Sequence, residues 1–284
     1  MSEPAEIYPL GRDTTESTRL NEQHKLIMDI VGGSIDKTVP LDNVHSVADI
    51  ATGTGVWLRD AQKALNKDSD EHQRYYHGFD ISAAQFPITS EGIELSVQDV
   101  LKPFPPEHHN RYDLVHVRLL VTAIKEPELQ AVVSNLRTIL KPGGFLQWIE
   151  IDFTGLYETP VHPKAAEAVK LWLQFIEQHG ISQCAPKTLQ VAYEKAGLVN
   201  TTSRTSFIRG HEDLTSRAQA WQLEFFATVV PLVLRRTGQA TTDEEVSKKT
   251  LELIKDVELA CAAGEVLDLR FGTVVGQKPS PDVL

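Results

Sequence analysis

The sequence predicts an α/β protein built on a doubly wound, mostly parallel sheet, and two observations support this fold class. A short apolar strand at 47–50 runs into a small-residue loop with two glycines, and a helix follows at once. Further short apolar strands then alternate with helical segments along the chain. Because crossover helices join neighbouring parallel strands, this alternation places the strands side by side in one sheet.

The remaining strands follow in order, and the expected total is seven. An amphipathic helix is expected at 129–140, and Lys141-Pro142-Gly143-Gly144 is expected to turn the chain into the fifth strand. After the first strand, the strands are expected at 75–80, 93–100, 112–118 and 145–151, within the helix-and-strand segment 186–209, and at 266–276.

Two long helical insertions are expected between the last strands. The first runs from Pro163 to His179, and the second runs from Leu214 to Arg236 and is followed by a helix at 243–263. Apolar residues recur in them at helical spacing, which predicts that one face of each helix packs onto the body. In this fold, such additions are where substrate specificity is expected.

The loop after the first strand, residues 51–55, reads as a ligand-binding loop. Glycine lets a backbone turn sharply and lets a ligand approach closely, and the helix behind it offers free N–H groups. A dinucleotide loop would need a third glycine at Leu58, and a phosphate-binding P-loop would need Gly-Lys-Ser/Thr after Gly55. Neither is present, so the loop fits a ligand without a phosphate group.

An aspartate stands at the end of each of the first three strands. Asp80 follows Asp49 by 31 residues (80 − 49), which is the spacing of successive strands in a βαβ unit. A carboxylate at Asp80 can accept both hydroxyls of a ribose. Asp99 can accept an adenine amino proton, while Val100 packs against the ring. Together these side chains predict a nucleoside-like ligand at one edge of the sheet.

The chain resembles class I S-adenosylmethionine-dependent methyltransferases. More narrowly, it is similar to the fungal methyltransferases of secondary-metabolite clusters, which include gliotoxin-type N-methyltransferases and the velvet-associated regulator. Residues 49–57, 78–82, 112–118 and the Lys-Pro-Gly-Gly turn carry the resemblance. It implies a Rossmann-like fold, S-adenosylmethionine as cofactor and methyltransferase activity. One departure is Ala51, which stands where most members have the first glycine of the loop.

An upstream segment, 8–24, resembles the helix with arginine, leucine and histidine that precedes the loop in that group. The resemblance places this segment over the cofactor, where Arg19 would bind the methionine carboxylate and Tyr8 would close over the same end. The alternative for Arg19 is a surface ion pair with Glu16 or Glu22 at helical spacing. The cofactor-binding residues expected in all are Tyr8, Arg19, Asp49, Ala51, Gly53, Gly55, Asp80, Ile81, Asp99, Val100, Val117 and Arg118.

Methyl transfer from a sulfonium needs alignment, exclusion of water and, for a weakly acidic acceptor, a base. Candidates for the base are His24, His116 and Glu150, with Asp152 and His211 as further choices. The expected substrate pocket is lined by aromatic residues of the two insertions, namely Trp172, Trp221, Phe225 and Phe226. The alternative for these aromatics is simple packing of the insertions onto the body.

Three segments describe the expected domain organisation. Residues 1–40 form an N-terminal helical cap, and residues 41–155 form the Rossmann-like core that binds S-adenosylmethionine. Residues 156–284 supply the remaining core strands together with the helical insertions, at about 158–182 and 212–263.

Composition limits the partners. The net charge of −11 disfavours nucleic acid, which needs a basic surface, and no apolar run is long enough to suggest a membrane span. The two cysteines, Cys184 and Cys261, lie far apart without a metal-binding motif, so no metal is expected. Met1 to Glu6 lack the basic and apolar regions of a secretion signal. We expect a cytoplasmic protein, monomeric or homodimeric.

The function that these observations favour is transfer of a methyl group from S-adenosylmethionine to an O, N or S atom of a small, largely apolar secondary metabolite. The sequence leaves the acceptor atom open. Two alternatives keep the same cofactor site: a methyltransferase-fold regulator of secondary metabolism, and an enzyme that binds the cofactor but catalyses a rearrangement or cyclisation without methyl transfer.

Overall fold

The structure is a computed structural model that describes residues 14–66, 74–89, 92–209 and 211–280. Its centre is a seven-stranded sheet in the order β3-β2-β1-β4-β5-β7-β6. Every strand pairing is parallel except those of β7, which runs antiparallel to both β5 and β6. The predicted doubly wound, mostly parallel, seven-stranded sheet is therefore confirmed. The strands are β1 (Ser46–Ile50), β2 (Tyr75–Asp80), β3 (Ile93–Val97), β4 (Tyr112–Arg118), β5 (Leu140–Asp152), β6 (Val199–Phe207) and β7 (Arg270–Gln277).

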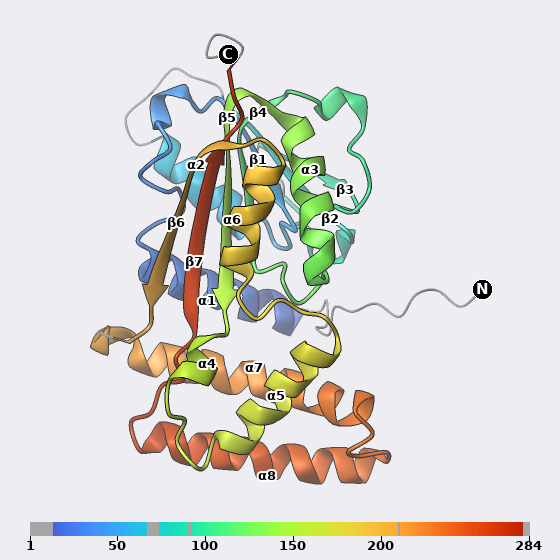
Figure 1. Cartoon of the computed structure of the whole chain (residues 1–284), viewed down its shortest axis with the longest axis vertical. Coiled ribbons are helices and arrows are strands. Elements are labelled where there is room, and N and C mark those ends of the chain that lie inside the picture. Colours follow the sequence, from blue (N-terminus) through green and yellow to red (C-terminus); the bar gives the residue numbers. More distant parts are fainter. Residues whose placement is uncertain (1–13, 67–73, 90–91, 210, 281–284) are drawn as a thin grey trace, which may run out of the picture.

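Helices cover both faces of the sheet. One face packs against α1 (Thr14–Val31) and α2 (Val56–Leu65), and the other against α3 (Leu129–Ile139) and α6 (Ala185–Lys195) (Figure 1). All five residues of β1 are buried, as expected for a parallel strand between two helical layers. Its side chains alternate: Val47 joins the core under α1 and α2, whereas Ala48 and Ile50 join the core under α3 and α6.

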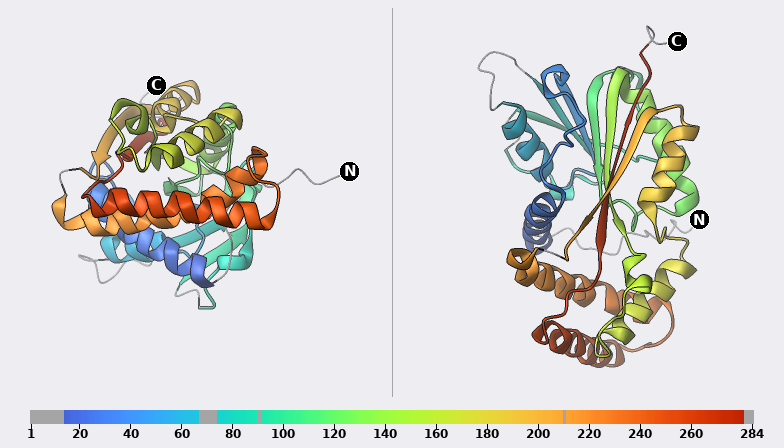
Figure 2. Two further views of the ribbon diagram at one scale, coloured as in Figure 1. Left: turned by 90° about the horizontal axis from the view of Figure 1, so that it is seen from below. Right: turned by 60° about the vertical axis from the view of Figure 1, so that its left-hand side comes forward.

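A helical lobe lies beyond the carboxyl ends of the parallel strands. It consists of α5 (Ala166–Gln178), α7 (Thr215–Arg236) and α8 (Asp243–Ala262), and a short helix, α4 (Gly155–Glu158), precedes it. Helix α1 crosses between the sheet and α7 (Figures 1 and 2). The two predicted insertions therefore form one lobe. Short 3₁₀ helices occur at Leu41–Asn43, Ala83–Gln85, Pro106–His108, Glu126–Glu128 and Glu212–Leu214.

Three predicted boundaries are wrong. The third strand ends at Val97 rather than 100, since the N–H of Gln98 already binds Asp80 O and the chain then turns at Asp99. Residues Lys141–Gly144 form an irregular part of β5 rather than a turn before it, because the main chain of Gly143 and Gly144 pairs with Lys278. The last strand begins at Arg270 rather than 266, because the side-chain amide of Gln222 binds both the N–H and the C=O of Leu267, and these groups are then not free for a strand.

Candidate functional site

The order of the strands reverses between β1 and β4, which are neighbours in the sheet. In doubly wound sheets, ligands bind outside the carboxyl ends of the strands at such a reversal. The chain leaves β1 at Ile50 and β4 at Arg118, so the loops that follow these two residues flank the crevice. Most of the predicted cofactor-binding residues lie in or beside these loops.

The loop after β1 holds three residues in the left-handed region: Ala51 (φ 56°), Gly53 (φ 52°) and Gly55 (φ 70°). Glycine adopts this conformation freely, which accounts for Gly53 and for Gly55 at the start of α2. Ala51 adopts it with its Cβ present, which is unfavourable by about 1–2 kcal/mol. The alanine that departs from the family pattern thus adopts a backbone conformation that favours glycine.

Asp49, near the end of β1, binds the loop through a side-chain hydrogen bond. Its side chain is buried, accepts a hydrogen bond from Thr52 Oγ1 at 2.7 Å and lies 2.8 Å from Nδ1 of His116. Behind Thr52 lies Gly78 of β2, where a Cβ would stand 2.7 Å from Thr52 Cγ2. Packing under the loop therefore leaves no room for a side chain at residue 78.

Asp80 is the last residue of β2, and Asp99 lies two residues beyond the end of β3 at Val97. Asp80 is half-buried, and its Oδ2 accepts a hydrogen bond from Gly53 N at 2.9 Å. Ile81 beside it exposes 58% of its side chain. Asp99 Oδ1 accepts from Leu101 N at 2.9 Å. The ribose and adenine of S-adenosylmethionine fit this set of groups. It consists of a loop backbone without large side chains, the carboxylates of Asp80 and Asp99, and the exposed apolar side chain of Ile81.

Three further predicted residues lie at these strand ends: Val117 and Arg118 end β4, and Val100 follows β3. Val117 is completely buried in the core under α3 and α6, so only its main chain is left for a ligand. Arg118 is half-buried at the end of β4. Val100 packs in part against the same core as Val117.

Helix α1 lies on the loop. Asn21 Oδ1 accepts a hydrogen bond from Thr54 Oγ1 at 2.7 Å, and Leu20 is the nearest side chain to the open side of Gly53. Arg19 forms a bidentate ion pair with Glu16, with its closest contact at 2.6 Å, so the alternative pairing is present, but both side chains are nearly buried rather than on the surface. Its role at a cofactor carboxylate stays a prediction. Tyr8 lies outside the described residues.

His24 of α1 is held by a carboxylate of α2. The side chain is 1% exposed, and its Nε2 lies 2.7 Å from Asp60 Oδ2. Burial, and next the positive charge of Arg118, lower the pKa of His24 to about 4. A neutral imidazole in this position carries its proton on Nε2, facing Asp60. Nδ1 then presents a lone pair, and this buried atom has no partner among the described residues.

His116 of β4 forms a second pair of this kind with Asp49. Its ring is fully buried and stacks on Trp57 at 3.7 Å between centroids. Burial lowers the pKa of His116, and the hydrogen bond to Asp49 opposes that shift. Nδ1 faces Asp49, so Nε2 carries the free lone pair and lacks a partner among the described residues.

Glu150 of β5 is fully buried, and burial raises its pKa to about 7. Its carboxylate accepts hydrogen bonds from the main-chain N–H groups of Leu120, Val121 and Ile151 and from the indole of Trp148. These donors take up most of its lone pairs. The geometry gives no support to Glu150 as a base.

Comparison with known proteins agrees with this geometry. The family model described as Methyltransferase domain matches residues 24–203. The chain belongs to this methyltransferase family. It is 29% identical over 259 residues to methyltransferase grgD from a Penicillium species, covering 89% of this chain and 90% of that protein. It is 27% identical to N-methyltransferase gliN from Aspergillus fumigatus, covering 65% and 71%.

Solved structures show the same fold at low identity. Haemonchus contortus phosphoethanolamine N-methyltransferase 2, in complex with S-adenosylhomocysteine, superposes with a TM-score of 0.51 at 14% identity. The match covers 90% of this chain and 53% of the Haemonchus chain, so the present chain spans about half the length of that structure. The family and the crevice agree on the cofactor: the chain is an S-adenosylmethionine-dependent methyltransferase.

The aromatic residues predicted for a substrate pocket lie in the lobe of the methyltransferase. Trp172 contacts Phe225 edge-to-face at 4.9 Å, and Phe226 is buried beside Phe225. Trp221 packs against Phe271 of β7. The indole N–H groups of Trp172 and Trp221 are buried without a partner among the described residues. These aromatic side chains contact one another and β7, and their place in a substrate pocket stays a prediction.

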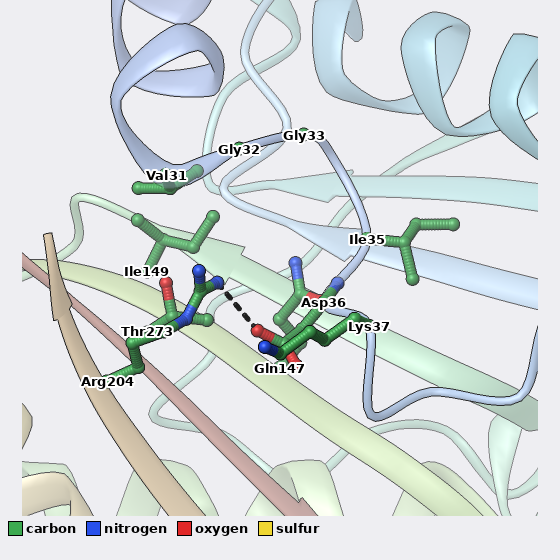
Figure 3. A pocket seen from close by; sticks show the side chains of 10 residues that line it. All are labelled: Val31, Gly32, Gly33, Ile35, Asp36, Lys37, Gln147, Ile149, Arg204 and Thr273. Carbon is green, nitrogen blue, oxygen red and sulfur yellow. Dashed lines mark hydrogen bonds and ion pairs between the residues drawn. The ribbon is translucent and has the colours of Figure 1, made fainter.

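A cavity of about 90 Å³ lies away from the crevice, on the sheet face that carries α1 (Figure 3). It lies between the end of α1 and strands β5, β7 and β6, and an ion pair of Arg204 with Asp36, at 2.8 Å, crosses it. The volume corresponds to about three water molecules, which is far too small for the cofactor.

Sequence reasoning missed three residues of the site. Asp60 and Asn21 lie on helices, and nothing in the local pattern indicates that they bind His24 and Thr54. Leu119, which follows β4, adopts a left-handed conformation (φ 52°) that its sequence context does not reveal. No sequence signal could have found these residues, because each acts through a contact made only on folding.

Proposed function

We propose that this methyltransferase transfers the methyl group to a nitrogen, oxygen or sulfur atom of a small, largely apolar secondary metabolite. The observation that carries the proposal is the lobe of α5, α7 and α8, which covers the carboxyl ends of the strands with apolar and aromatic side chains. Pockets for small molecules are mostly apolar with a few polar groups. The relatives named methyltransferase grgD and N-methyltransferase gliN support the same reaction class.

We place His24 as the proton acceptor, with Asp60 holding its tautomer. Helix α1 contacts the loop after β1 through Asn21, and it contacts α7 through an ion pair of Asp29 with Arg217. It therefore lies between the cofactor loop and the lobe, where the acceptor atom must lie. The lone pair of Nδ1, which is unpartnered within the part of the chain that the structure describes, supports the role because a neutral imidazole can take a proton there. A pKa of about 4 makes His24 a weaker base than one that titrates near pH 7. On this proposal, residues 1–40 act as the cap.

Incubation with methyl-labelled S-adenosylmethionine and a panel of apolar metabolites tests the reaction. The proposal predicts label in a small-molecule product and one S-adenosylhomocysteine for each product formed. A product made without consumption of the cofactor would instead support a cyclase. Cofactor binding with no acceptor in any panel, or label only on protein, would support a regulator, as in the relative named secondary metabolism regulator LAE1.

The role of His24 is tested by His24→Gln and Asp60→Asn, with Lys63→Ala as the matched control. Lys63 contacts Asp60 on its exposed side at 3.3 Å and does not contact His24. Loss of a general base reduces turnover by roughly 10²–10⁴-fold. We expect losses in this range for His24→Gln, a smaller loss with an altered pH profile for Asp60→Asn, and no change for Lys63→Ala. Equal turnover in all three variants would remove His24 from the mechanism.

A further inference from the structure

The loop after β4, residues 119–121, forms the wall of the crevice opposite the glycine loop. Strands β1 and β4 pair along their length up to Ile50 and Val117, so the two loops leave the sheet side by side. The shape of this second wall therefore bears on the cofactor as directly as the shape of the glycine loop does.

This wall has an unfavourable backbone. Leu119 adopts φ 52°, the left-handed conformation that residues with a Cβ avoid. Its N–H still pairs with Ile149 O at 3.0 Å, so the chain turns abruptly while attached to β5. A strained conformation persists only where its surroundings hold it. Some group must therefore fix residues 119–121.

Glu150 supplies the restraint. One oxygen, Oε2, accepts from Leu120 N at 2.8 Å, from Val121 N at 2.9 Å and from Trp148 Nε1 at 3.1 Å. The other, Oε1, accepts from Ile151 N at 2.9 Å. Two consecutive peptide N–H groups that point at one oxygen fix the orientation of both peptide planes. The side chain is completely buried, so water does not compete for these contacts.

We propose that Glu150 is a positioning residue, whose carboxylate holds residues 119–121 in the shape that cofactor binding requires. The inference rests on the crevice being the site of S-adenosylmethionine, and it gives Glu150 a role distinct from acid–base chemistry. Loss of the carboxylate should let Leu119 relax towards a negative φ. The wall would then move away from the cofactor, although no residue that contacts the cofactor has changed.

Hydrogen exchange tests the restraint without any ligand. In Glu150→Gln, a neutral amide with one oxygen replaces a carboxylate that binds four donors, so the contacts to Leu120 N and Val121 N weaken even where they persist. We expect the amides of Leu120 and Val121 to exchange roughly tenfold faster, because a neutral acceptor holds them less strongly than a charged one. Glu245→Gln is the matched control: Glu245 accepts from two consecutive amides at the start of α8, in the lobe. It should leave residues 119–121 protected.

Calorimetry with S-adenosylhomocysteine tests the consequence. Glu150→Gln should weaken binding about tenfold, and adding Leu119→Gly should restore part of that loss, because glycine adopts φ 52° without strain. Unchanged exchange in Glu150→Gln, or faster exchange with unchanged affinity, would overturn the inference. A wild-type chain that does not bind S-adenosylhomocysteine would instead overturn the cofactor assignment.

Leu119→Pro tests whether the shape of residues 119–121 affects cofactor binding, and this test remains even if Glu150→Gln does not fold. Proline fixes φ near −65° and has no N–H for Ile149, so it forces the wall out of its shape while Glu150 stays in place. We expect it to weaken S-adenosylhomocysteine binding at least as much as Glu150→Gln. An affinity equal to that of the wild type would show that the shape of the wall does not matter.

Discussion

Substituting His24 with leucine should change how the stability of the protein depends on pH. The pKa of His24 falls from its ordinary 6.5 to about 4, chiefly because the ring is buried. The folded state thus binds the proton more weakly than the unfolded state does. The contribution of neutral His24 to the stability of the fold is fully present above pH 6.5 and is lost as the pH falls through 4. Leucine at residue 24 has no proton to bind, so this dependence disappears.

The magnitude follows from the two pKa values. Each pH unit between 6.5 and 4 is worth about 1.4 kcal/mol, so acidification from pH 7 to 4 should lower the free energy of unfolding by about 3 kcal/mol more in the wild type than in His24→Leu. Burial also lowers the pKa of His77 to about 4. His77 titrates in both proteins, so its effect on the free energy of unfolding cancels in the difference.

Urea unfolding, followed by tryptophan fluorescence at several values between pH 7 and pH 4, measures this difference. The difference between the two stability curves should change by about 3 kcal/mol between pH 7 and pH 4, with the wild type losing more. Parallel curves would refute the argument, because they would mean that His24 is protonated as easily in the folded chain as in the unfolded one.

Three further substitutions have specific outcomes. Gly78→Ala places a Cβ 2.7 Å from Thr52, so it should destabilise the protein by about 1–3 kcal/mol and weaken S-adenosylhomocysteine binding in calorimetry. Unchanged binding would show that packing under the loop is unimportant. Trp221→Phe should lower turnover with the acceptor more than cofactor affinity, as separate kcat and binding measurements would reveal. The pKa of Glu150 rises from 4.5 to about 7, so its contribution to stability, present below pH 4.5, is lost by pH 7. Glu150→Gln should remove this decline of about 3 kcal/mol in urea unfolding.

The cofactor crevice could be predicted from the sequence to a large extent, because its signals are local. Gly53 and Gly55 mark a backbone that needs left-handed conformations, and Asp80 ends an apolar strand that can be recognised without its neighbours. The hydrogen bond between Asp80 and Gly53 N joins two such local features. Once the strands are in order, the parallel sheet brings these residues to one edge.

The residues that act through distant contacts could not be predicted in the same way. His24 and Asp60 are 36 residues apart, and only the packing of α1 on α2 joins them. The sequence indicates Glu150 only as a candidate base at a strand end, whereas the turn after β4 supplies two of its hydrogen-bond donors. Its burial and its partners depend on tertiary structure, so the sequence alone could not indicate the positioning role proposed above.

The central claim is that S-adenosylmethionine binds in the crevice between β1 and β4, with Asp80 at its edge. Calorimetric titration of S-adenosylhomocysteine into the wild type and into Asp80→Asn tests it most directly. We expect saturable binding to the wild type, and binding at least about tenfold weaker to the variant, because a charge-assisted hydrogen bond contributes roughly 1.5–3 kcal/mol. Equal affinities, or no binding to the wild type, would contradict it.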